Sequence, residues 1–248
     1  MLNDPIPPYN KPPIIEAVIA LHFVAPLEQK DIDTFARKSK KSFPFSEDII
    51  EMSTIFNPQT KQQASNVRKI GNKLNSADRT RLIMIQSTQF GVIQQAPYTD
   101  WDALYKDARS HWEVLKKIVV HKPVSRVSTR YINRIDIPIG QDGYIDLQKY
   151  FNVGLSLPAY AQGMALQNFF VTSALRHPNG QYMNVLQVAA APSPLIDHLS
   201  VTIDIDVATI GEVPVDEDKL WGLIHGLRKY KNDLFESCIT PDTRSLFQ

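Results

Sequence analysis

The sequence predicts an α+β fold of two similar halves with largely antiparallel sheets, each half ordered strand, helix, three strands, helix. Two observations support this. Apolar and polar residues alternate at period two in many segments, which is typical of half-buried strands. Each half also closes on a segment with apolar residues three and four positions apart, which is typical of a helix packed on a core. We place the halves at residues 1–122 and 123–248, joined in one compact unit. The halves share a pattern and no evident sequence identity, and a single antiparallel sheet with helices on one face is the alternative.

The segment RVSTRYINRIDIP, residues 126–138, is the strand on which this assignment depends most. Its alternation places five residues on one side, Val127, Thr129, Tyr131, Ile135 and Ile137. The other side carries three arginines spaced four residues apart, Arg126, Arg130 and Arg134. We expect the first side to face the core, because β-branched and aromatic residues suit a half-buried strand.

The first half is predicted to begin with a strongly apolar strand at residues 14–24 and a helix at 27–42. Three strands follow, at residues 49–56, 66–74 and 82–92. The closing helix covers residues 101–119, where Thr99 or Asp100 can cap its first turn. Trp112 lies on the apolar stripe of this helix, so we expect it to pack onto a sheet.

The second half is predicted to repeat that order. After the strand at 126–137 comes a short helix at 147–151, then strands at 164–176, 182–191 and 199–208. The last helix runs from residue 220 to about residue 235 and is opened by Asp216 or Asp218. A one-residue register slip would exchange the two faces of every strand, so burial tests the prediction. We expect the following side chains to be buried: Ile19, Leu21, Tyr131, Ile135, Ile203, Ile205 and, from the closing helix, Leu227.

Composition is that of an ordinary globular protein, with 43% apolar and 21% charged residues in 248. The net charge of +1 gives no global field toward nucleic acid or membrane. One cysteine, Cys238, excludes an internal disulfide and suits a reducing compartment. No apolar run approaches the roughly 18 residues needed to span a bilayer. We therefore expect a cytoplasmic protein without a membrane partner.

Four segments occur in order along the chain: PPIIEAVIALHF, RYINRIDIP, LSVTIDIDV and HGLRKYKNDLFESCITPDTRSLF. Together they resemble a sporadically distributed family of bacterial proteins of about this length whose biochemical role is uncharacterised. The resemblance covers essentially the whole chain. It implies a bacterial, cytosolic protein that is patchily inherited, as defence and toxin–antitoxin genes often are. It supplies no catalytic residues.

The strand arginines form the first candidate site, together with Asp204 and Asp206 on the polar side of the strand at 199–208. One interpretation is a set of cross-strand ion pairs on a solvated surface. A second is an anion-binding platform of Arg126, Arg130 and Arg134, because the planar guanidinium suits phosphate and carboxylate. A third adds Mg²⁺ held by Asp204 and Asp206, which would act on a phosphorylated or nucleotide substrate.

Other chemistry-bearing motifs are absent from the sequence. The histidines show no zinc-binding spacing, and there is no nucleophile elbow, P-loop or dinucleotide-binding glycine motif. Cys238 and His225 lie on one predicted helix, too far apart for a catalytic pair. The C-terminal residues Leu246 and Phe247 are similar to the tail of peptides that dock into the bacterial sliding clamp, or they fold back as an anchor.

These observations lead to two hypotheses of function. The first is a non-enzymatic, macromolecule-binding interaction protein of a bacterial defence or toxin–antitoxin locus, which needs no cofactor. Its partner is expected to be another protein, with nucleic acid, the sliding clamp or a second copy of the chain as alternatives. The second hypothesis is a Mg²⁺-dependent enzyme acting through Asp204 and Asp206.

Overall fold

The computed structural model describes residues 9–59, 61–119, 123–141, 143, 145–154, 158–161, 164, 166 and 168–248. In this part of the chain the fold is α+β, with an antiparallel sheet of the order β2-β3-β4-β5-β1-β6-β9-β8-β7 and helices. No helix in the described ranges has both the length and the hydropathy to cross a membrane.

The chain divides into two compact units. Unit 1 comprises residues 1–18, 96–98 and 127–248, and unit 2 comprises residues 19–95 and 99–126. The expected halves, 1–122 and 123–248, differ from these units at residues 1–18, 96–98 and 123–126. The reason is that two strands run through both units, β1 (Ile14–Phe23) and β6 (Val124–Pro138).

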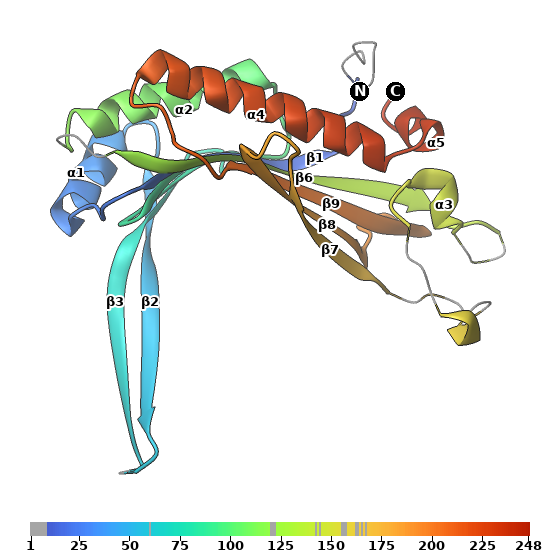
Figure 1. Ribbon diagram of the computed structural model, residues 1–248, viewed down its shortest axis with the longest axis horizontal. Coiled ribbons are helices and arrows are strands. Elements are labelled where there is room, and N and C mark those ends of the chain that lie inside the picture. The colour runs from blue at the N-terminus through green and yellow to red at the C-terminus, as the bar shows by residue number, and fades with distance from the viewer. Residues whose placement is uncertain are drawn as a thin grey trace. The chain divides into compact units, whose positions relative to one another are not determined.

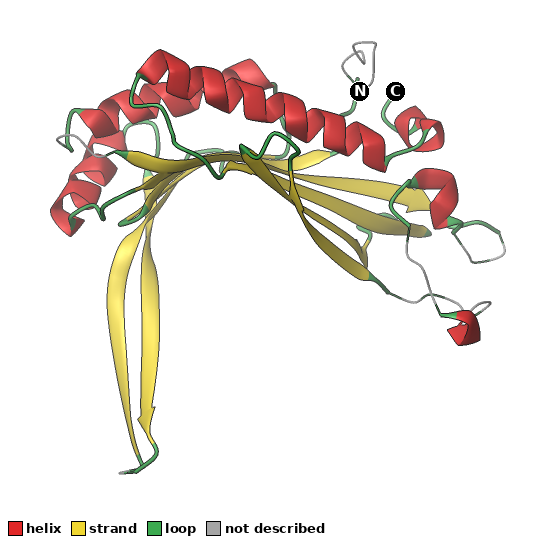
Figure 2. Ribbon diagram, in the orientation of Figure 1, coloured by secondary structure: helices red, strands yellow, loops and turns green. Residues whose placement is uncertain are grey.

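Unit 2 contains four further strands that form two hairpins in sequence. They are β2 (Phe45–Asn57), β3 (Gln62–Asn75), β4 (Arg81–Gln86) and β5 (Gln89–Gln95). Two helices, α1 (Gln29–Ser39) and α2 (Trp101–Lys116), cover one face of these strands (Figures 1 and 2). Aromatic contacts join the layers, because Phe90 meets both Phe35 and Trp112.

Unit 1 contains three further strands, β7 (Phe170–Arg176), β8 (Tyr182–Pro192) and β9 (His198–Thr209). The long helix α4 (Glu217–Cys238) packs along one face, with its main contacts on β9 (Figure 1). Smaller helical elements are α3 (Leu147–Tyr150), a 3-10 turn at Ala159–Ala161 and α5 (Pro241–Ser245).

The predicted strand faces are confirmed. Every side chain expected in the core is at most 5% exposed: Ile19, Leu21, Trp112, Tyr131, Ile135, Ile203, Ile205 and Leu227. Two of the proposed helix caps also hold. The Asp100 carboxylate accepts a hydrogen bond from the Ala103 amide at 2.7 Å, and Asp216 accepts one from Lys219 at 2.9 Å.

The exact repeat of the two halves is not confirmed. Four strands, not three, separate α1 from α2, because the expected strand at 82–92 folds as β4 and β5 around a bend at residues 87–88. Both strands of this hairpin are buried on the same core, so the apolar pattern continues across the bend. The expected strand at 164–176 begins only at Phe170, and residues 165 and 167 lie outside the described part. The short helix α5, which begins at Pro241 and is capped by Thr240, was not expected.

Candidate functional site

On the polar face of β6 and β9, the first predicted site, Arg130 and Arg134 each form an ion pair with an aspartate. Arg130 lies opposite Asp206 in the register but bonds diagonally to Asp204. Its Nε donates to Asp204 Oδ1 at 2.9 Å and its terminal nitrogen donates to Oδ2 at 2.5 Å. This two-pronged bond raises the pKa of Arg130, and the charges of Asp206 and Glu16 add to the effect.

The other two arginines have different partners. Arg134 lies 3.3 Å from Asp136, two residues along its own strand. Asp136 also accepts hydrogen bonds from the hydroxyls of Ser200 and Ser193. Arg126 belongs to unit 2, where it contacts the imidazole of His22 at 3.2 Å. The sequence did not point to Asp136 or His22 as partners.

The cross-strand ion-pair interpretation agrees with these contacts, because Arg130 and Arg134 each lie within 3.3 Å of a carboxylate. The anion-binding interpretation stays a prediction. Both Asp204 oxygens are also engaged by Arg130, and no three His, Cys, Asp or Glu among the described residues are placed to hold a metal ion.

The two C-terminal residues of the predicted partner tail, Leu246 and Phe247, differ in burial. Phe247 is 4% exposed and its ring meets Tyr9 edge-on at 5.0 Å, while its carbonyl accepts from the Lys11 amide. Leu246 is 37% exposed. Phe247 thus occupies the position expected of a fold-back anchor. Nearby, burial raises the pKa of Cys238 to about 11, so its thiol stays protonated at neutral pH.

The most distinctive surface is the distal part of the β2–β3 hairpin, residues 50–56 and 63–69, which we call the hairpin arm. It extends beyond the helices that cover the base of the same hairpin (Figure 1). Large apolar side chains on it are 59–71% exposed: Ile50, Met52, Ile55, Phe56 and Val67. Scattered exposed apolar residues are normal, whereas a contiguous group marks an interaction site.

The strand register gathers all of these side chains except Ile55 on one face. Met52 lies opposite Val67, and Ile50 and Phe56 follow on the same side of β2. Between them Thr54 and Ser65 place their hydroxyls 3.3 Å apart. We call this side the apolar arm face.

The opposite face of the arm is mostly polar. It carries the cross-strand pair Glu51–Arg68 at 2.7 Å and the pair Ser53–Asn66. Ile55 is its one exposed large apolar residue. The arm is therefore an amphipathic ribbon.

The apolar arm face continues the face that α1 covers at the base of the hairpin. Near the base, Lys69 bridges Asp33 of α1 at 3.1 Å and Asp48 of β2 at 2.9 Å. A bulge between Ile49 and Ile50 lies where the covered base of the hairpin ends and the exposed arm begins. At the same point Gly71 lies so close to β4 that an added Cβ would sit 2.3 Å from the Ile85 carbonyl oxygen. Beyond this point β3 leaves β4, and the arm continues as two strands only.

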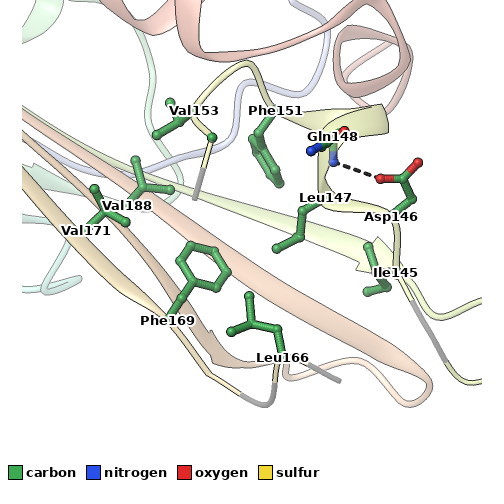
Figure 3. Close-up of a pocket in the computed structure, with 11 residues that line it drawn as sticks. Ile145, Asp146, Leu147, Gln148, Phe151, Val153, Leu166, Phe169, Val171 and Val188 are labelled. Atoms are coloured by element: carbon green, nitrogen blue, oxygen red, sulfur yellow. Dashed lines mark hydrogen bonds between the residues drawn. The ribbon is translucent and has the colours of Figure 1, made fainter. Parts of the chain in front are cut away.

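A second feature is an apolar pocket of about 230 Å³ in unit 1, between α3 and strands β7 and β8 (Figure 3). Its walls include Leu147 and Phe151 from the α3 side. Phe169, Val171 and Val188 line it from the strand side. The polar Asp146 caps α3 by accepting from the Gln148 amide at 3.0 Å.

Unit 1 also contains a buried cation. Lys231 on α4 is 5% exposed, and its Nζ lies 3.7 Å from the centre of the Tyr131 ring. Burial, together with the charge of Arg228, lowers the pKa of Lys231 to about 7. Neither this lysine nor the hairpin arm was singled out by sequence patterns. A strand pattern at 49–56 was visible, but alternation does not say whether a helix covers it.

Comparison with models of known protein families finds no match to this chain, and comparison with curated proteins finds none either.

Proposed function

We propose that this protein is a non-enzymatic interaction module that packs its apolar arm face against another polypeptide. The single observation that carries the proposal is the exposed, one-sided grouping of Ile50, Met52, Phe56 and Val67. These side chains would lose water contact on binding, which is the main favourable term in most protein association.

The physics of an isolated hairpin supports a role in binding. Two strands alone are marginally stable in water, and stability normally requires a third strand or a packed helix. Among the residues that the structure describes, neither covers the distal part of the arm, yet its strands are 13 and 14 residues long. A chain that retains apolar alternation over such a length gains from it only when something covers that face.

The chemistry of the face indicates what would cover it. Among the described side chains of the apolar arm face, the one charged group is Lys69, which is already paired with Asp33 and Asp48. An uncharged apolar face is complementary to another such face, and a second arm is one. A second copy of the chain, related by a two-fold axis, is therefore the partner we propose.

The test is the oligomeric state of matched variants, measured by sedimentation equilibrium over a concentration series. Met52→Lys places a charge on the apolar arm face. Ser53→Lys, one residue along the same strand, places the same charge on the polar face. We expect the wild type and Ser53→Lys to form dimers and Met52→Lys to remain monomeric. A monomeric wild type at about 100 μM, or a dimeric Met52→Lys protein, contradicts the proposal.

On the resemblance to a sporadically distributed bacterial family, the proposal extends to a locus of the defence or toxin–antitoxin type. The dimer would then be the form in which the module meets its other macromolecular partners.

A further inference from the structure

We infer that the pocket between α3 and strands β7 and β8 is a binding site for an uncharged, apolar ring compound between benzene and indole in size. This site lies in unit 1, so it is independent of the hairpin arm in unit 2.

The pocket exists because the apolar face of the sheet extends beyond its main helix. Helix α4 makes its main contacts with β9, whereas β7 and β8 lie further toward the edge of the sheet. Val171 and Val188 are opposite each other on the side of these strands that faces the core. Figure 3 shows both valines directed toward the space that Leu147 and Phe151 close from the α3 side.

The segment that closes the pocket is held by hydrogen bonds that do not depend on what the pocket contains. The Asn152 amide donates to the Cys238 carbonyl at 2.9 Å, and Phe151 forms a β-bridge with Ile239. The Thr240 amide donates to the Tyr150 carbonyl at 3.1 Å, and the Thr240 hydroxyl donates to the Lys149 carbonyl at 2.6 Å.

These bonds tie α3 to the residues that follow α4. Because these bonds hold α3 to the residues after α4, α3 keeps its position without packing directly onto β7 and β8. A largely preformed space of this kind is typical of ligand pockets.

The lining and the volume select the ligand. The described pocket walls are mainly hydrocarbon, and the one carboxylate among their described residues, Asp146, already caps α3. A charged ligand would lose its hydration without gaining a partner there. An apolar cavity of about 150 Å³ accommodates benzene, so the 230 Å³ here suits one or two fused rings.

The experiment titrates indole and benzene into the full-length protein and follows binding by calorimetry and by methyl NMR signals. We expect saturable binding, with shifts at the methyl groups of Val171 and Val188. Val185, which lies on the other face of β8, should not shift.

Two variants of neighbouring residues on β7 test the location. Val171→Phe fills the pocket, whereas Thr172→Phe adds the same ring to the opposite, exposed face. We expect Val171→Phe to lower the affinity for indole at least tenfold and Thr172→Phe to leave it within twofold. Circular dichroism establishes that both variants fold.

Absence of saturable binding of either compound by the wild type overturns the inference. Equal affinity of wild type and Val171→Phe does so as well. If Val171→Phe does not fold, the methyl shifts in the wild type decide the matter, because shifts confined to other sites also overturn it.

Discussion

The hairpin arm of unit 2 and the β7–β8 end of unit 1 are two places where an apolar strand face extends beyond its main helix. In the arm the face is bare, and its large apolar side chains are more than half exposed. At β7 and β8 the face is partly covered by α3, which leaves a half-open pocket instead of a bare surface. The same alternation thus produces a site for a macromolecule in one region and a site for a small molecule in the other.

The difference arises from what is tethered nearby. In unit 1 the residues after α4 hold α3 over the strands by backbone and side-chain hydrogen bonds. In unit 2 helix α1 packs on the base of the hairpin, where Asp33 pairs with Lys69, and the strands continue beyond that pair. Short, hydrogen-bonded segments, more than the strands themselves, decide which kind of binding surface an apolar face becomes.

The largest expected effect compares the covered and the bare parts of the same face. Phe35 of α1 is fully buried and meets Phe90 edge-on at 5.7 Å, so Phe35→Ala should lower the free energy of unfolding by about 3–5 kcal/mol. Phe56→Ala on the arm should change it by less than about 0.5 kcal/mol, because the ring is already in water. Urea denaturation at dilute, monomeric concentration measures both. Equal losses would mean that the arm is covered within the monomer.

The second prediction compares buried and exposed cations through pH. The folded pKa of Lys231, about 7, is below its unfolded value, so the unfolded state holds more protons between about pH 7 and 10.5. Stability from this group therefore rises as pH rises through that window, by at most about 1.4 kcal/mol per pH unit. Lys231→Met should be more stable than the wild type at pH 7, and the difference should shrink at pH 8.5.

Denaturation of both proteins at the two pH values measures this difference. Arg68→Met on the arm is the matched control, because its exposed side chain should leave the pH dependence unchanged. A Lys231→Met variant that is less stable than the wild type at pH 7 would indicate that the charged amine over the Tyr131 ring is net stabilising.

The smallest expected effect compares two cross-strand ion pairs. Arg130→Ala removes a two-pronged bond to Asp204, whose side chain is 14% exposed, and should cost about 1 kcal/mol. Arg68→Ala removes a pair whose members are 67% and 51% exposed, and should cost about 0.5 kcal/mol or less. Thermal denaturation at low and high salt measures both. A stable Arg130→Ala protein that binds phosphate more weakly than the wild type would support the anion-platform hypothesis.

Local pattern was sufficient for most of the elements and for the direction of the core side chains that it named. The alternation in residues 126–138 placed Tyr131 and Ile135 in the core and Arg130 outside, because pleating forces neighbours onto opposite faces. The caps at Asp100 and Asp216 were among the candidates predicted from the sequence, because a cap bonds to an amide only three residues away.

Contacts between residues distant in sequence could not be predicted from local pattern. The diagonal pairing of Arg130 with Asp204, the bend between β4 and β5, and the tether of α3 to the residues after α4 all depend on strand register and on long-range contacts. The sequence by itself determined which faces are apolar, because side-chain direction follows from local backbone geometry. Only the tertiary structure decided which of those faces are covered, because cover is supplied by segments far along the chain whose placement no local pattern encodes.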